Sequence, residues 1–196
     1  MTTPEQRFDE AIARFDAANR DDPNKETVQG QEFPKELLYA QRMTEWLQRL
    51  APDASEAVRL AVRCQHICRW TIPRSQFPMD RDGYLLWRKT LASFHADKAG
   101  GILREVGYGE DAIAAVQALL RKEQLKLNPE TQLLEDVVGL VFLEYYCADF
   151  AGQHEEEMLL TILRKTWAKM SPRGREAALR LEVPAVVRGL IEKALG

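Results

Sequence analysis

The sequence has little cysteine and no long hydrophobic run. Three cysteines in 196 residues are odd in number and too few for a disulfide framework, so the composition fits a reducing compartment. No apolar stretch approaches the ~20 residues that a membrane-spanning helix needs. The first residues, MTTPEQRFDEAIARF, contain early acidic side chains and lack the apolar core of a secretory signal. We therefore expect a cytoplasmic protein that does not insert into a membrane.

Common nucleotide-binding and hydrolase motifs are also missing from the sequence. Neither GxxxxGK nor GxSxG occurs, and no segment shows the alternating pattern of a half-buried strand. The formal net charge of -3 argues against general binding to nucleic acid or to membrane surfaces. Residues 59–89 depart from this balance, because seven Lys and Arg against two Asp give a local charge of +5. Such a segment attracts phosphates and carboxylates.

Apolar residues recur at helical spacing along nearly the whole chain, which predicts an all-α fold. The pattern indicates a single domain over residues 1–196, built as a bundle of about eight or nine helices. Residues 20–33 have few apolar side chains and contain Pro23 and Gly30, so they are predicted to form a loop. A loop of this length is often functional.

Helix-capping signals predict where the helices in the middle of the chain begin and end. Asp53 and Glu56 have the spacing of a capping box, which predicts a helix that begins there and ends at Trp70. Prolines then interrupt the periodicity over residues 73–83. We expect the next helix to begin near Tyr84, so that the two ends of the basic segment lie close together.

Several polar side chains stand on apolar helix faces. Periodicity places Glu36, His66, His95 and Asp136 on or beside the buried rows of four different helices, and Gln65 precedes His66. Burying such groups without partners costs roughly 1–3 kcal/mol each. Imidazoles and carboxylates gathered from facing helices commonly hold a metal ion in helical bundles. The set therefore predicts either a divalent-metal site or separate hydrogen bonds inside the core.

The order of these residues resembles the layout of the HD superfamily of metal-dependent phosphohydrolases. In the family pattern a histidine opens the first helix and a His-Asp pair ends the next, and here Glu36 and Gln65-His66 stand at those places. Asp136 matches the last aspartate of the family. His95 resembles an additional histidine that some members use for a second metal. The resemblance implies catalytic positions for Glu36 and Gln65.

The HD-like layout covers about residues 33–150, and we expect helices within residues 154–196 to pack on this core. The resemblance implies a divalent metal bound by His66, His95 and Asp136. A metal ion in such a site lowers the pKa of a bound water and directs it at a phosphate ester.

A more specific resemblance is to a family of unknown function that occurs in bacteria and fungi. The stretches that carry it are ELLYAQRMTEWL, RCQHICRWTIPR, RDGYLLWR and LEDVVGLVFLEYY, which are spread over most of the chain. Some fungal members bear the name glutamyl-tRNA synthetase. That name does not transfer, because this chain is short and lacks the strand-and-glycine pattern of a nucleotide-binding catalytic core.

A cluster of cations and flat rings forms the predicted substrate-binding set. Its members are Arg69, Trp70, Arg74, Tyr84, Trp87, Arg88 and Lys122. Arginine forks match phosphate oxygens, and the rings suit the stacking of a base. Lys122 falls where some HD proteins have a further histidine. The alternative is structural: arginines paired with acidic residues of neighbouring helices, and tryptophans in the core.

Two functional hypotheses follow from these residues. The first is a metal-dependent phosphohydrolase that acts on a nucleotide or another phosphate ester, with Glu36 as a further ligand or as the base. The second is a non-catalytic module that binds a nucleotide or an RNA end in the same cationic pocket. Gln65 favours the second hypothesis, because an amide is a poor metal ligand.

Overall fold

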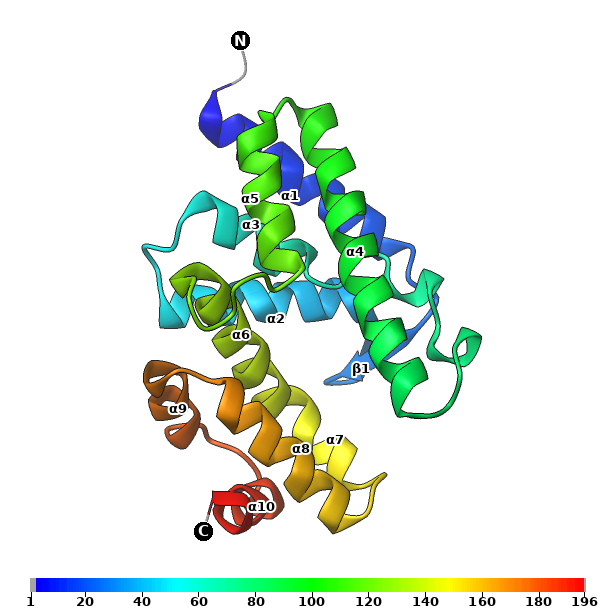
Figure 1. Cartoon of the computed structure of the whole chain (residues 1–196), viewed down its shortest axis with the longest axis vertical. Coiled ribbons are helices and arrows are strands. Elements are labelled where there is room, and N and C mark those ends of the chain that lie inside the picture. Colours follow the sequence, from blue (N-terminus) through cyan, green and yellow to red (C-terminus); the bar gives the residue numbers. More distant parts are fainter. Residues whose placement is uncertain (1–2, 196) are drawn as a thin grey trace.

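The computed structural model describes residues 3–195 as an elongated assembly of helices (Figure 1). In this part of the chain there are ten α-helices and one two-stranded hairpin, which confirms the predicted all-α class. The helices are α1 (Pro4–Arg20), α2 (Lys35–Leu50), α3 (Glu56–Cys64), α4 (Arg81–Val106), α5 (Glu110–Leu120), α6 (Pro129–Val141), α7 (Cys147–Ala151), α8 (Glu156–Lys169), α9 (Pro172–Leu179) and α10 (Ala185–Leu195). Among residues 3–195, no helix combines the length and the apolar character that crossing a membrane requires.

Side-chain caps fix where several helices begin. Thr3 and Gln6 form a reciprocal capping box at α1, and the Asn128 side chain accepts hydrogen bonds from the first turn of α6. At α3 the cap is Ser55, whose side chain accepts from a backbone N–H in the first turn. The predicted cap at Asp53 is therefore wrong by two residues, and a serine supplies the oxygen that the orphan donors need.

The segment predicted to be a loop contains a β-hairpin. Strand β1 (Lys25–Val28) pairs antiparallel with β2 (Gln31–Pro34). Gln29 and Gly30 join the strands with φ angles of 51° and 80°, and two positive φ values at these positions match the right-handed twist of paired strands. The loop prediction for residues 20–33 is corrected to this extent. The strands gave no clear signal because each has only four residues and no buried side chain.

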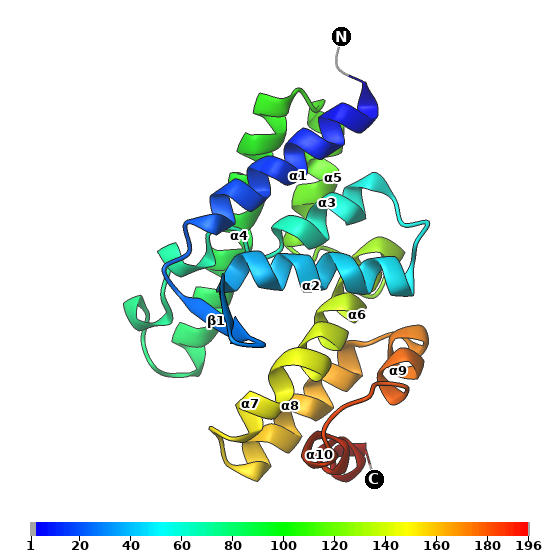
Figure 2. The same cartoon turned by 180° about the vertical axis from the view of Figure 1, so that it is seen from behind.

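Helix α2 crosses the middle of the molecule and joins its two ends (Figure 2). Helices α1, α3, α4 and α5 lie toward the N-terminal end, whereas α6 leads to the opposite end, where α7 to α10 gather (Figure 1). Side chains from both ends belong to one apolar core, for example Phe15 of α1, Met43 of α2 and Leu140 of α6. The C-terminal helices complete this core, because α9 contacts α6 and α10 contacts α7 and α8.

A π-helical segment, Phe142–Tyr146, connects α6 to α7. Apolar periodicity predicted one uninterrupted helix here, and its division is why the structure has ten helices in place of eight or nine. A π-turn adds a residue to one helical turn and rotates the side chains that follow. Such segments are frequent at functional sites.

The helix predicted to reach Trp70 ends earlier. Helix α3 stops at Cys64, Cys68 takes a left-handed conformation with φ of 52°, and a 3-10 turn over Arg69–Thr71 follows. Helix α4 begins at Arg81, three residues before the predicted start. The chain direction therefore changes within the basic segment, directly before Arg69, and this change affects where the arginines that follow point.

Candidate functional site

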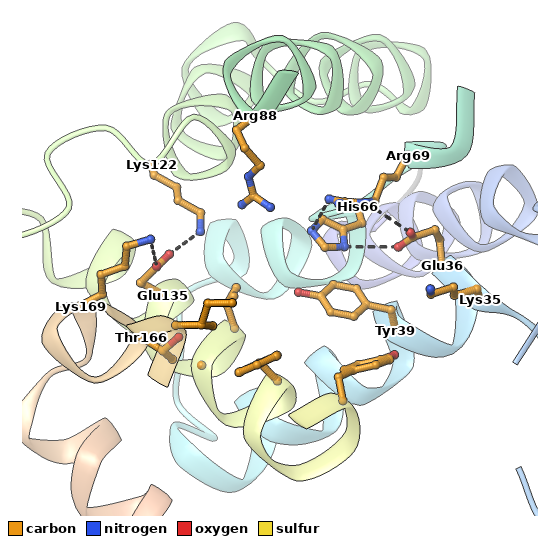
Figure 3. Close-up of a pocket in the computed structure, with 15 residues that line it drawn as sticks. Lys35, Glu36, Tyr39, His66, Arg69, Arg88, Lys122, Glu135, Thr166 and Lys169 are labelled. Carbon is orange, nitrogen blue, oxygen red and sulfur yellow. Dashed lines mark hydrogen bonds and ion pairs between the residues drawn. The ribbon is translucent and has the colours of Figure 1, made fainter. Parts of the chain in front are cut away.

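A pocket of about 340 Å³ opens between α2, α4, α6 and α8 (Figure 3). Its volume lies within the usual range for small-molecule sites. Apolar side chains form part of its lining: Val138, Phe142 and Ile162. The charged lining consists of five cations and two carboxylates: Lys35, Arg69, Arg88, Lys122, Lys169, Glu36 and Glu135. The pocket therefore carries an excess of positive charge beside an apolar surface, and we call it the central pocket.

Arg88 of α4 lies near the middle of the central pocket. Its half-buried side chain points into the pocket between the charged groups on either side (Figure 3). Within residues 3–195, its guanidinium makes no hydrogen bond or ion pair. A guanidinium has five N–H donors, so an unpaired one in a partly enclosed site is suited to an anionic ligand.

Two lysines share one carboxylate at one side of the pocket. The ammonium of Lys122 contacts Glu135 Oε2, and the Nζ of Lys169 lies 3.5 Å from Glu135 Oε1. Burial opposes the charge on Glu135, but the two lysines outweigh it and hold the pKa of Glu135 below its ordinary value. Burial lowers the pKa of Lys122, and Glu135 partly offsets this effect. The group keeps a net positive charge.

The Lys122 backbone is itself unusual, with φ of 56°. A non-glycine residue in the left-handed region costs free energy, and such residues cluster at functional sites. Cys68, with φ of 52°, holds the same conformation directly before Arg69. Two loops that present cations to the pocket are thus held in conformations that their residue types disfavour.

Glu36, His66 and Arg69 form a second charged group on the opposite side (Figure 3). His66 Nδ1 lies 3.3 Å from Glu36 Oε2, and Arg69 Nε lies 3.7 Å from Glu36 Oε1. The Arg69 Nη1 is 3.4 Å from His66 Nε2. A guanidinium can only donate, so Nε2 accepts, and the proton of a neutral imidazole resides on Nδ1. The Nδ1–H of His66 then lies next to the Glu36 carboxylate.

Burial dominates the protonation of this group. It raises the pKa of Glu36 to about 7, although the Arg69 charge acts in the opposite direction. Burial also lowers the pKa of His66 well below its ordinary value, and the nearby Arg69 adds to this effect. His66 is therefore neutral at pH 7, so its 3.3 Å contact with Glu36 is not an ion pair. A carboxyl group with a pKa near 7 suits acid–base chemistry.

The aromatic surroundings hold the His66 ring in place. Tyr39 stacks on the His66 ring with 4.2 Å between the ring centroids. The centroid of the His95 ring lies 5.7 Å from that of His66. His95 is buried and does not line the central pocket, and burial lowers its pKa to about 3. Its Nε2 and the buried Gln65 Oε1 have no hydrogen-bond partner within residues 3–195. Gln65, predicted to be catalytic, does not line the pocket.

Asp136 and the two histidines, the predicted metal set, do not form a ligand group within residues 3–195. The Asp136 carboxylate accepts a hydrogen bond of 2.7 Å from the Ser171 backbone, another from the Ser171 hydroxyl and one of 3.1 Å from Gln132. The two bonds from Ser171, the residue that caps α9, hold the start of α9 against α6. Within residues 3–195, no group of three or more His, Cys, Asp or Glu side chains is placed to hold a metal ion.

The predicted basic and aromatic cluster is divided by the structure. Arg74 donates to the Phe77 and Asp80 carbonyls of its own loop and does not line the central pocket. Tyr84 is exposed, with its ring beside Trp87. Trp70 and Trp87 line a neighbouring hollow instead. The loop bends in two 3-10 turns, which sequence periodicity does not reveal.

Several residues of the pocket were not predicted: Lys35, Tyr39, Glu135, Tyr146 and Lys169. Lys35 and Glu135 are sequence neighbours of the predicted Glu36 and Asp136. Successive helical residues point about 100° apart, so the choice of Asp136 selected the face toward α9 in place of the face toward the pocket. The adjacent acidic pair was a usable signal. The position of Tyr146 depends on the π-segment and gave no signal.

The arrangement can hold an anion against an apolar surface and can transfer a proton through Glu36. In comparisons with known proteins, no curated protein and no solved structure matches the chain. A family model does match, over residues 9–191, which is nearly the whole chain. The chain therefore belongs to the family described as domain of unknown function (DUF4202).

Proposed function

We propose that this protein binds a phosphorylated small molecule in the central pocket, with the phosphate held by Arg88, Lys122 and Lys169. The observation that carries the proposal is the unpaired guanidinium of Arg88, which faces a lysine pair that shares a single carboxylate. Cations that lie this close repel one another, and a bound dianion relieves the repulsion.

Phosphate fits this environment better than a carboxylate. It brings up to two negative charges and several acceptor oxygens, whereas a carboxylate has one charge and two oxygens. The apolar surface of Val138, Phe142 and Ile162 would contact the rest of the ligand. A reducing, cytoplasmic location agrees with the three free, buried cysteines. Such a compartment is rich in phosphorylated metabolites.

A calorimetric panel tests the proposal. The panel contains inorganic phosphate, ribose 5-phosphate, glucose 6-phosphate, AMP and a 3′-phosphorylated RNA dinucleotide. We expect saturable binding of at least one phosphorylated compound, and weaker binding by about 1.5–3 kcal/mol in Arg88→Ala, the range for a hydrogen bond to a charged group. The matched control is Lys89→Ala, which removes one exposed cation from the same turn of α4.

The control separates specific contact from net charge. Lys89→Ala should leave the affinity nearly unchanged, because an exposed charge is screened by salt. Equal losses in both variants would mean that only overall charge matters, and no binding of any compound would refute the proposal. Preference for the RNA dinucleotide over the small molecules would favour an RNA end, the other partner suggested by the sequence.

A second candidate function is hydrolysis of the bound phosphate ester. The observation that favours it is the buried Glu36 carboxyl, which has a pKa of about 7 and lies 3.3 Å from His66 Nδ1. In its ionised form Glu36 accepts a proton from a water as the water oxygen bonds to phosphorus. The phosphorus–oxygen bond to the leaving alcohol breaks, and the Glu36 proton passes to that alcohol oxygen.

The resemblance to the HD superfamily agrees with this reaction class, but its metal set does not fit, because Asp136 is bound to Ser171 and Gln132. A divalent cation remains a prediction for which Glu36 and His66 are the remaining candidate ligands. Release of phosphate from each bound panel compound, with and without Mg²⁺ or Mn²⁺, tests the candidate. Glu36→Gln should abolish release while it preserves binding. Release by the native protein that survives this substitution would contradict the role of Glu36.

A further inference from the structure

A second hollow, of about 600 Å³, adjoins the central pocket. Three residues line both spaces: Lys35, Glu36 and Arg69. The ion pair between Arg69 Nε and Glu36 Oε1, 3.7 Å apart, therefore lies at the boundary between the two spaces. We call this second space the side hollow. Because the two spaces share these side chains, one ligand can occupy both.

Two tryptophans lie in the wall of the side hollow. Besides the three shared residues, the side hollow is lined by Trp70, Trp87, Ile72, Pro73, Pro23, Asn24 and Lys25. Trp87 is already engaged, because its indole N–H donates to the Ile72 carbonyl at 2.9 Å and the Arg69 guanidinium lies 4.8 Å from its ring centroid. Trp70 is half buried, and its indole N–H has no hydrogen-bond partner among residues 3–195.

The shared residues suit the part of a ligand that joins a phosphate to a ring. Arg69 can donate to a phosphate oxygen at the edge of the central pocket, near Arg88. Glu36 can accept a hydrogen bond from a hydroxyl group at the boundary. The exposed Lys35 adds a further cation there. Beyond this point Trp70, Trp87 and Ile72 offer flat and apolar surfaces beside the polar Asn24 and Lys25. Such a mixture suits a planar ring that carries polar groups on its edge.

We infer that the ligand is a nucleoside monophosphate whose base stacks on Trp70 in the side hollow while its phosphate lies in the central pocket at Arg88, between Arg69 and the lysine pair. The inference rests on the proposed phosphate binding and adds the class of ligand and the place of its ring. Stacking on an aromatic side chain is available to every base, so Trp70 provides affinity for a base without choosing among bases.

The test compares AMP with ribose 5-phosphate, which has the same sugar and phosphate but no base. Calorimetry with the full native chain should show AMP binding about tenfold more tightly, the effect of one stacked base. Trp70→Leu keeps apolar bulk and removes the aromatic face, so it should reduce AMP affinity to that of ribose 5-phosphate. Ribose 5-phosphate affinity should not change. Trp167→Leu, on α8 outside both spaces, is the matched control and should keep the preference for AMP.

The outcomes separate this inference from the proposal beneath it. Equal affinity of the native protein for the two compounds would overturn the stacked base and leave phosphate binding intact. A preference for AMP that survives Trp70→Leu would overturn the role of Trp70. Binding of neither compound would overturn the inference, whereas binding of another phosphorylated compound in the panel would still support the proposed function. The native comparison does not depend on any variant, so it stands even if Trp70→Leu fails to fold.

Discussion

Replacing Glu36 with glutamine should make the stability of the protein less dependent on pH in a defined direction. Burial raises the pKa of Glu36 from 4.5 to about 7. The folded protein therefore keeps a proton that the unfolded chain has already released at intermediate pH. The free energy of unfolding must fall as pH rises from 4.5 to about 7, and it levels off above that range.

The magnitude follows from the same two values. Each pH unit of difference corresponds to about 1.36 kcal/mol, so the full effect is about 3 kcal/mol. Between pH 5 and pH 8 the free energy of unfolding of the native protein should fall by about 2–3 kcal/mol relative to that of Glu36→Gln, which cannot ionise at this position. His66 and His95 act in the opposite direction, since their lowered pKa values cost stability as pH falls below 6.5. Burial is the main cause for both, so their contributions largely cancel in the difference.

Urea denaturation of both proteins at pH 5, 6, 7 and 8 measures this difference, provided that the denaturant slopes agree. Glu110→Gln is a suitable control, because a hydrogen bond from Arg104 lowers the pKa of Glu110 and its titration lies below this pH range. The control difference should be flat from pH 5 to pH 8. The account would be refuted if the difference in the free energy of unfolding between the native protein and Glu36→Gln did not change with pH. It would also be refuted if the native protein became more stable relative to this variant as pH rises.

Three further substitutions, one of them with a control substitution, test other parts of the structure. Gly83→Ala should destabilise the protein by roughly 1–3 kcal/mol in thermal or urea unfolding, because a Cβ would lie 2.1 Å from the Pro78 carbonyl oxygen. Gly101→Ala on the same helix meets nothing within 4 Å and should be neutral or stabilising by up to about 1 kcal/mol, so equal losses would contradict the crowding at Gly83. Asp136→Ala should cost about 1–3 kcal/mol of stability but leave calorimetric phosphate affinity unchanged, and a loss of affinity would reopen its role in the site. Glu135→Gln should tighten phosphate binding and lower stability, since two lysines lose their shared counter-ion; weaker binding would show that the carboxylate positions them.

The helical fold could be predicted from the sequence because the signals for helices are local. Apolar spacing and oxygen-bearing caps such as Thr3 and Asn128 act within one or two turns, and the structure has helices where these signals occur. The hairpin was missed because strands of four residues without buried side chains leave little periodic signal. The π-segment at Phe142–Tyr146 was missed because its register depends on tertiary contacts.

Only part of the candidate site could be predicted from the sequence, for a geometric reason. Periodicity identified Glu36 and His66 as polar groups on apolar faces, and the structure brings them to one pocket. It could not decide which of two adjacent acids, Glu135 or Asp136, faces that pocket, because this depends on how α6 packs between α8 and α9. The choice of Arg74 failed because its loop bends and uses the guanidinium to bind its own carbonyls.

The central claim, that the unpaired guanidinium of Arg88 binds phosphate, can be tested at that side chain directly. Arginine Nε–Hε resonances are followed by NMR while the native protein is titrated with AMP, and Arg88 is identified by its loss in Arg88→Lys. The account predicts a saturable shift of the Arg88 resonance with no comparable shift of Arg81, an exposed arginine at the start of the same helix. Saturable binding that leaves the Arg88 resonance in place, or equal unsaturable shifts at both arginines, would contradict it.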